Sequence, residues 1–104
     1  MPTKCKIVYL TPASEDFEEI VKFHITQVGT QSARRIYATM RDTINRLASF
    51  PLMGQTHPDP LLAAAGFRKL VLNKTYVAIY KVHKDTVAIY RIVNGATNYP
   101  RLLR

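Results

Sequence analysis

Apolar side chains recur every three or four residues along two stretches of the N-terminal half, which is the period of a helix with one buried face. The first stretch begins at Thr11-Pro12, where a proline fits the first turn of a helix, and ends at Gly29. The second begins at Thr30 and ends at Phe50-Pro51, because the residue before a proline is forced out of the helical region. The short gap between the stretches predicts an antiparallel pair of helices.

After Gly66 the pattern changes to the alternation that is typical of strands. Over 67–72 this period places Phe67, Lys69 and Val71 on one side and Arg68, Leu70 and Leu72 on the other, and runs rich in β-branched and aromatic residues follow at 76–82 and 86–93. Short polar turns separate these runs, so the C-terminal half predicts a three-stranded antiparallel meander. A further short strand, 6–10, precedes the first helix and is expected to pair with an edge of the meander. Residues 51–65, punctuated by proline and glycine, predict an irregular connection.

These elements predict an α+β fold of order β-α-α-β-β-β, with the helical pair packed on one face of an antiparallel sheet. The 104 residues suffice for one hydrophobic core, and no repeat or linker divides them, so we expect one domain over residues 1–104. The other face of the sheet needs no cover. We expect the lysines and arginines on that face to form a docking surface.

The charge balance indicates an anionic partner. The chain has fifteen Lys and Arg against seven Asp and Glu, a formal net charge of +8. Residues 53–104 contain eight of the basic residues and only two of the acidic ones, so the excess lies mainly in the C-terminal half. Such an excess is typical of proteins that bind nucleic acid. A basic surface that only keeps the protein dissolved is the simpler alternative.

Composition also argues against several other kinds of site. Cys5 is the one cysteine, which excludes an internal disulfide and a Cys₂His₂ site. The three histidines are scattered and no carboxylate pair has ligand spacing, so we expect no metal and no cofactor. The longest apolar runs, such as 61–65, fall far short of the roughly 20 residues that cross a membrane. No apolar leader precedes the first strand, and we therefore expect a cytoplasmic protein without a membrane partner.

Several motifs, taken together, resemble the RelE/ParE superfamily of bacterial toxins. They are Thr11-Pro12-Ala13 and residues 47–54 (LASFPLMG), 66–70 (GFRKL), 76–82 (YVAIYKV) and 91–103 (RIVNGATNYPRLL). Their order, spacing and total length are more specific than any one of them. The resemblance implies a small cytoplasmic toxin of a type II toxin–antitoxin module. It also implies a cognate antitoxin that wraps an acidic, partly disordered segment around the toxin, in a homodimer or a toxin–antitoxin hetero-oligomer.

The resemblance leaves two targets open. RelE-like members cleave messenger RNA on the ribosome, whereas ParE-like members poison DNA gyrase, and phosphate contacts would serve either target. RelE-like members use sheet lysines and arginines with a tyrosine or histidine near the C-terminus. Here Val77 stands at one usual arginine position, and Ala96 and Thr97 stand at another. This loss of charge favours the gyrase branch or a divergent target. An mRNA endonuclease and a catalytically silent module that binds nucleic acid or protein remain the alternatives.

If the chain is an endoribonuclease, we expect Arg68, Arg91 and Tyr99 to be its catalytic residues. Arg91 interrupts an apolar strand, so it must be paired or face a polar surface. Tyr99 lies in a polar tail where a ring has little reason to be buried, and base stacking, acid catalysis and anchoring of the tail all stay open. The candidates for contacts to nucleic acid or to another target are Lys69, Lys74, Lys81 and Arg101.

The antitoxin is expected to cover exposed apolar side chains, either as a helix across the helical pair or as a strand added to the sheet edge. Packing within the monomer is the alternative for the same residues. The candidates are Ile25, Val28, Leu61, Leu62 and Leu103.

Overall fold

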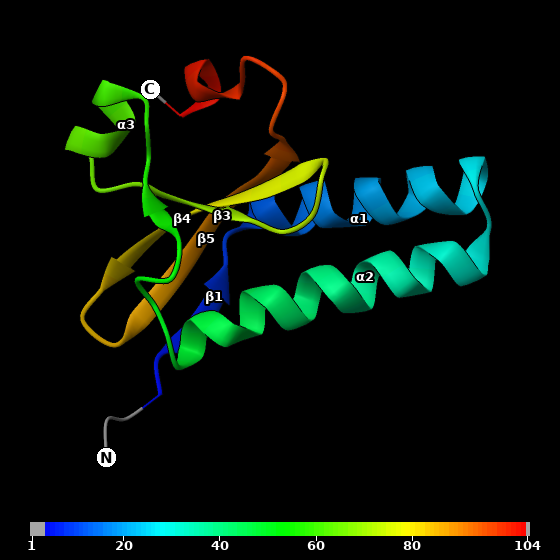
Figure 1. The fold of residues 1–104 in the computed structure, drawn as a ribbon, viewed down its shortest axis with the longest axis horizontal. Coiled ribbons are helices and arrows are strands. Elements are labelled where there is room, and N and C mark those ends of the chain that lie inside the picture. The colour runs from blue at the N-terminus through cyan, green and yellow to red at the C-terminus, as the bar shows by residue number, and fades with distance from the viewer. Residues whose placement is uncertain (1–3, 104) are drawn as a thin grey trace.

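The computed structural model describes residues 4–103. Its elements are, in order, β1 (Lys6–Tyr9), α1 (Thr11–Gln27), α2 (Thr30–Asn45), η1 (Arg46–Ala48), β2 (Gln55–Thr56), α3 (Pro60–Ala64), β3 (Arg68–Val71), β4 (Tyr76–His83), β5 (Thr86–Asn94) and η2 (Tyr99–Leu102). Figure 1 shows α1 and α2 as an antiparallel pair, and α3 and η2 near each other at the end of the molecule away from the N-terminus. The α+β class and the helical pair followed by a meander are confirmed.

The sheet has five strands in the order β1-β5-β4-β3-β2, and its central part is the expected antiparallel meander. β1 joins the edge of the meander, as expected, but it runs parallel to β5, with Lys6 beside Thr86 and Tyr9 beside Ile89. The direction differs because the two strands are joined through the helices and the rest of the sheet. A long connection permits parallel pairing, whereas a hairpin forces an antiparallel one.

The connection 51–65 is more ordered than its composition predicts. β2 pairs with β3, Gln55 beside Lys69, and extends the sheet by one short strand. Asp59 then caps α3, because its carboxylate accepts the free amides of Leu61 and Leu62 at 3.0 and 3.2 Å. Pro60 occupies the first turn of this helix, where no amide is needed. The expectation of an irregular connection is therefore wrong for these two elements, which are too short to show a period.

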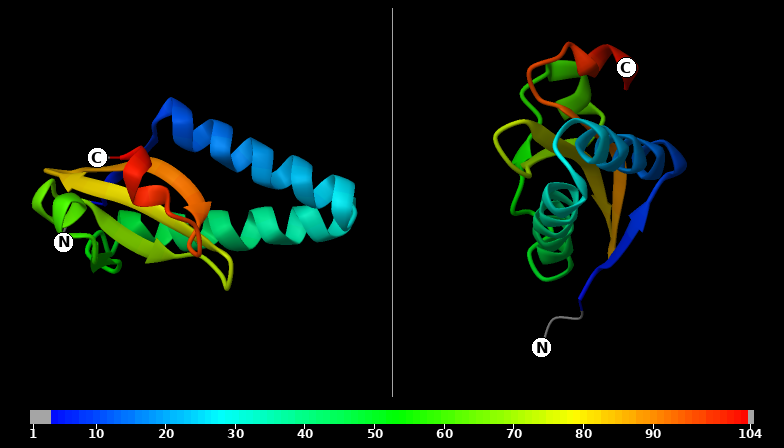
Figure 2. Two further views of the ribbon diagram at one scale, coloured as in Figure 1. Left: turned by 90° about the horizontal axis from the view of Figure 1, so that it is seen from above. Right: turned by 90° about the vertical axis from the view of Figure 1, so that its right-hand side faces the viewer.

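The main core lies between the helical pair and the first face of the sheet, as expected. The helices bury Ala13, Phe17, Ile20, Met40 and Ile44 against sheet residues that include Leu70, Ala78, Tyr80, Val87, Ile89 and Ile92. Figures 1 and 2 show that the helical pair extends well beyond the sheet. For that reason the apolar side chains near the turn between the helices stay exposed, with exposed fractions of 45% for Ile25 and 63% for Val28.

The second face of the sheet is covered, which corrects the expectation that it is bare. α3 and η2 place Leu62 and Tyr99 against Val77, Ile79 and the side chain of Phe67, and Leu103 packs at the margin of this group. We call this group the second-face cluster. Leu62, expected at the surface, is only 1% exposed, whereas Leu61 is 62% exposed. The sequence does indicate the second-face cluster in one way. β4 is apolar at successive positions, which is typical of strands that are buried on both faces.

Candidate functional site

A bulge in β5 lies directly before Arg91, whose side chain bonds α1. The pairing shifts from Ile79–Arg91 to Tyr80–Ile89, so Tyr90 is an extra residue in its strand. Tyr90 packs at the second-face cluster, and Arg91 contacts α1. Its Nε and Nη2 donate to the two carboxylate oxygens of Asp16 at 2.7 and 2.9 Å.

This ion pair is part of the scaffold. The carboxylate of Asp16 also accepts the backbone amide of Ile92 at 3.0 Å, so it joins α1 to β5 through both a side chain and the main chain. The hydrogen bond from Arg91 to Asp16 raises the pKa of the arginine further. The sequence argument that an arginine in this strand needs a partner is confirmed, and the partner is a residue of the protein itself.

Arg68, the second candidate for catalysis, holds the loop that follows the helices. Its guanidinium donates to the carbonyl oxygens of Gly54 and Leu52, the latter at 3.1 Å. The hydroxyl of Tyr80 fixes the same loop: it accepts the amide of Gly54 at 3.0 Å and donates to the carbonyl of Pro51 at 2.9 Å. Arg68 is thus engaged with the loop at the β2 side of the sheet, whereas Arg91 is engaged with α1.

Tyr99, the third candidate, is buried in the second-face cluster and is only 6% exposed. The expectation of a ring in an open polar tail is wrong, because α3 and the strands provide an apolar site for it. Its hydroxyl lies 2.7 Å from Nε2 of His57, a residue that is 3% exposed. Burial, and then the negative charge of Asp59, raise the pKa of Tyr99, so the phenol keeps its proton at neutral pH.

His57 was not selected from the sequence, yet its hydrogen bonds fix its protonation state. Nδ1 accepts the backbone amide of Asp59 at 2.9 Å, so a neutral His57 carries its proton on Nε2 and donates it toward the hydroxyl of Tyr99. Burial, and then the positive charge of Lys69, lower the pKa of His57. One sequence signal could have pointed to His57: it lies two residues before Asp59-Pro60, where a helix begins.

The basic candidates for target contacts lie mainly around the second face. Nζ of Lys81 lies 4.3 Å from the ring centre of Phe67 and 5.3 Å from that of Tyr90, which are cation–π distances. Lys69 lies on the same face by strand alternation. Lys74, in the β3–β4 turn, and Arg101, in η2, are exposed.

The three catalytic candidates therefore do not converge. Cleavage of RNA requires a base for the 2′-hydroxyl, positive charge at the phosphate and an acid for the leaving oxygen within one site. Arg68 holds carbonyl groups, Arg91 holds Asp16 of α1, and Tyr99 is buried beside His57. Val77, at one usual arginine position, is 5% exposed within the second-face cluster.

Other kinds of site can be assessed only over the part of the chain that the structure describes. Within residues 4–103, no three His, Cys, Asp or Glu side chains gather as metal ligands. In the same range no helix has the length and apolar character that a membrane crossing requires.

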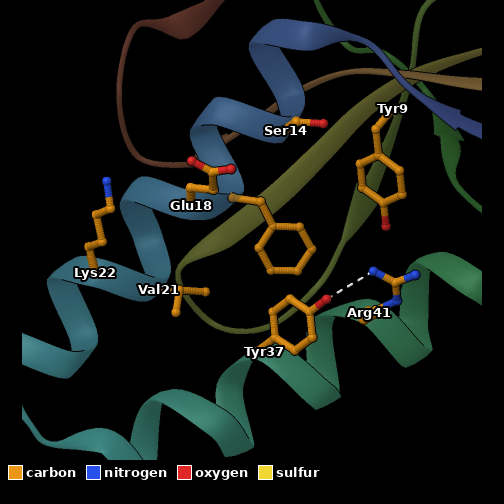
Figure 3. Close-up of a pocket in the computed structure, with 8 residues that line it drawn as sticks. Tyr9, Ser14, Glu18, Val21, Lys22, Tyr37 and Arg41 are labelled. Atoms are coloured by element: carbon orange, nitrogen blue, oxygen red, sulfur yellow. Dashed lines mark hydrogen bonds between the residues drawn. The ribbon is translucent and has the colours of Figure 1, made fainter.

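A groove opens on the helical side of the fold, between α1, α2 and the end of β1 (Figure 3). We call it the helical groove; it has a volume of about 480 Å³ and is lined by Tyr9, Ser14, Phe17, Glu18, Val21, Lys22, Tyr37 and Arg41. The rings of Phe17 and Tyr37 meet at 5.0 Å between their centres, and those of Tyr9 and Phe17 at 6.3 Å. The lining is thus aromatic and aliphatic at the floor, with charged groups at the rim.

Comparisons with solved structures place this fold among known toxins. The chain is similar to the chromosomal ParDE toxin–antitoxin system from P. aeruginosa, with 18% identity and a TM-score of 0.73 over 88% of this chain and 96% of that one. It is similar to the toxin–antitoxin complex RelBE2 from Mycobacterium tuberculosis, with 21% identity and a TM-score of 0.65 over 88% and 98%. A YoeB/ParE toxin from Agrobacterium tumefaciens follows at 17% identity and 0.58 over 86% and 96%.

At these identities, the likeness to solved structures shows the fold. No curated protein matches the sequence. The sequence does match one family, described as the ParE toxin of the type II toxin–antitoxin system parDE, over residues 7–99. That range includes the helical pair, the meander and Tyr99, so the chain belongs to the ParE toxin family of type II toxin–antitoxin systems, within the RelE/ParE superfamily.

Proposed function

We propose that this chain inhibits bacterial growth in the cytoplasm by a ParE-like action on DNA gyrase or by an action on a divergent target, and that a cognate antitoxin neutralises it. The family match and the toxin–antitoxin neighbours support the general part of this proposal. The choice of target rests on one observation. Both arginines that were candidates for catalysis are bound to groups of the protein itself, and the candidate tyrosine is buried.

A ribosome-dependent endonuclease is the alternative. Basic side chains do surround the second face, and His57 and Tyr99 are groups that exchange protons in enzymes. Against this, both rings are buried, and the surface above Val77 is apolar where a phosphate would need positive charge.

Two assays on the purified chain separate these functions. Supercoiling by DNA gyrase is measured with increasing amounts of the chain, and translated messages are examined by primer extension after the chain is added to ribosomes. We expect inhibition of supercoiling and no codon-specific cuts. Cuts without inhibition of gyrase would establish the endonuclease instead, and binding to nucleic acid without either effect would favour the catalytically silent module.

The proposed target surface is tested by removing exposed charge. The double variant Lys74→Gln/Arg101→Gln removes two exposed positive charges from the basic C-terminal half. Arg34→Gln/Arg35→Gln removes two exposed charges from α2 and serves as the matched control. We expect the first variant to inhibit its target at least several-fold less well than the control, because its charges belong to the C-terminal half, which we propose contacts the target. Equal loss in both variants would mean that only the overall charge matters.

A further inference from the structure

The turn between η1 and β2 displays apolar side chains to solvent. The amide of Met53 donates to the carbonyl of Phe50 at 3.0 Å and closes a turn over residues 50–53, which we call the apolar turn. Phe50 and Leu52 are each 65% exposed, and Met53 is 40% exposed. With Pro51 they line a shallow apolar hollow of about 560 Å³. Adjoining apolar side chains on a surface are typical of a binding site, because their exposure to water costs free energy.

The backbone of the apolar turn is held by the sheet beside it. The hydroxyl of Tyr80 donates to the carbonyl of Pro51 at 2.9 Å, and Nη2 of Arg68 donates to the carbonyl of Leu52 at 3.1 Å. Pro51 also restricts its own φ angle to the value that the second position of such a turn requires. These polar groups of the backbone are thus bound within the protein, and the apolar side chains form the outer surface.

The side chains of the turn take no part in the folded core. Within residues 4–103, neither the main core nor the second-face cluster includes any of residues 50–53. Two side chains of the sheet, Arg68 and Tyr80, nevertheless use their hydrogen bonds to fix the conformation of this segment. A surface that is already fixed loses little conformational entropy when it binds. The apolar turn is therefore prepared for a partner rather than for packing within the monomer.

Charge indicates which class of partner fits. Residues 43–58 contain one charged side chain, that of Arg46, whose carbonyl accepts the amide of Phe50 at 2.9 Å. Two copies of the chain, each with a net charge of +8, would bring like charges together at this surface. Leu52 and Met53 neither stack on bases nor bind phosphate, which argues against nucleic acid. The partner that fits is a protein whose apolar side chains are flanked by acidic groups.

We propose that the apolar turn binds the target protein that the toxin inhibits. Phe50 and Leu52 pack on an apolar surface of the target, and one apolar side chain of the target enters the hollow. Acidic groups of the target lie beside Arg46. This inference rests on the proposed function, because it takes the inhibited protein as the partner. Arg68 and Tyr80 are positioning residues, which hold the turn and do not touch the target.

The double variant Phe50→Ser/Leu52→Ser, which we call the turn variant, tests this contact. Phe23→Ser/Val71→Ser is the matched control, because it also removes one aromatic ring and one aliphatic side chain. These two residues lie in α1 and β3 and are 56% and 60% exposed. All four side chains lie largely in solvent, so both variants should stay folded, and urea unfolding checks this.

Growth arrest is measured first, because it does not depend on which target is inhibited. The wild type and each variant are induced without the antitoxin, and immunoblotting gives the toxin level that halves the growth rate. We expect the turn variant to need about tenfold more toxin than the wild type, because two side chains that anchor the complex are lost. The control should need a level within about twofold of the wild type.

Binding is then measured by calorimetry with purified DNA gyrase in the absence of DNA. We expect the affinity of the turn variant for gyrase to fall about tenfold and that of the control to stay as in the wild type. If the wild type arrests growth without binding gyrase, the target is divergent and the growth assay alone decides. Sedimentation of the isolated wild type measures self-association. A wild-type dimer that dissociates in the turn variant would assign the turn to a second copy of the chain and overturn the inference.

The outcomes separate this inference from the proposed function. If the wild type does not arrest growth, the proposed function fails, and the assignment of the partner fails with it. If the wild type arrests growth and the turn variant does so at the same level, the function stands and this inference is overturned. An equal loss in the turn variant and the control overturns it as well. A loss in the turn variant alone supports it.

Discussion

The hydroxyl of Tyr99 lies 2.7 Å from Nε2 of His57, and this contact joins the C-terminal turn η2 to the segment between β2 and α3. His57 also accepts the amide of Asp59 at 2.9 Å, so one imidazole holds both elements that cover the second face. The bond from the Asp59 amide depends on a neutral ring, because a proton on Nδ1 would remove the acceptor for that amide.

The free energy of unfolding should therefore fall at mildly acidic pH. The pKa of His57 is lowered from 6.5 in the folded protein. Above 6.5 the ring is neutral in both states and its contribution is complete. Below that pH the unfolded chain takes up a proton that the folded protein resists, so stability is lost as the pH falls toward the lowered folded-state pKa. Urea unfolding between pH 7.5 and 5.5 measures this loss.

The matched variants for that experiment are His57→Gln and His83→Gln. His57→Gln should be less stable than the wild type at pH 7.5, with a shallower further loss toward pH 5.5. His83 is exposed at the end of β4, so its replacement should leave the slope as in the wild type. If the free energy of unfolding falls equally steeply with pH in the wild type and in His57→Gln, the imidazole binds its proton equally well in the folded and unfolded states.

The Asp16–Arg91 pair should be important for stability even though it is an ion pair. Arg91→Met leaves the carboxylate of Asp16 with one backbone amide in a partly buried site, and we expect a loss of about 1–3 kcal/mol. Lys22→Met breaks an exposed pair with Glu19 and should change stability little. Thermal or urea unfolding compares the two. If the free energy of unfolding falls only slightly in Arg91→Met, water hydrates the carboxylate of Asp16 in place of the guanidinium.

The helical pair and the meander could be predicted because each extends over enough residues to show a period. α3 and β2 could not, since they span only 60–64 and 55–56. The bulge at Tyr90 adds a residue without breaking the apolar run of β5, so the partner of Arg91 could not be predicted from the alternation along that strand. Burial of Tyr99 depends on α3, and that is why its place in a polar tail was misleading.

Gly54 should tolerate no side chain. A Cβ atom at this position would lie 2.7 Å from the carbonyl oxygen of Lys69 and 2.7 Å from the hydroxyl of Tyr80. Gly54→Ala should therefore displace the hydroxyl that holds the loop and cost about 1–3 kcal/mol. Hydrogen exchange of the amide of residue 54, which Tyr80 accepts in the wild type, should become faster. Unchanged exchange would show that the backbone moves as a unit and keeps the bond.

Leu62 and Leu61 offer a test of the second-face cluster within a single short helix. Leu62 is 1% exposed against Tyr99 and Ile79, so Leu62→Ala should leave a cavity and cost about 2–5 kcal/mol. Leu61 is 62% exposed, and Leu61→Ala removes the same atoms from water, with a change within about 0.5 kcal/mol. Both variants keep the capping bonds of Asp59, because those are donated by backbone amides. If the two variants unfold at the same urea concentration, α3 does not cover the sheet in solution. A large loss in Leu62→Ala alone means that α3 and the C-terminal turn form part of the folded core, and that the basic surface is displayed around them.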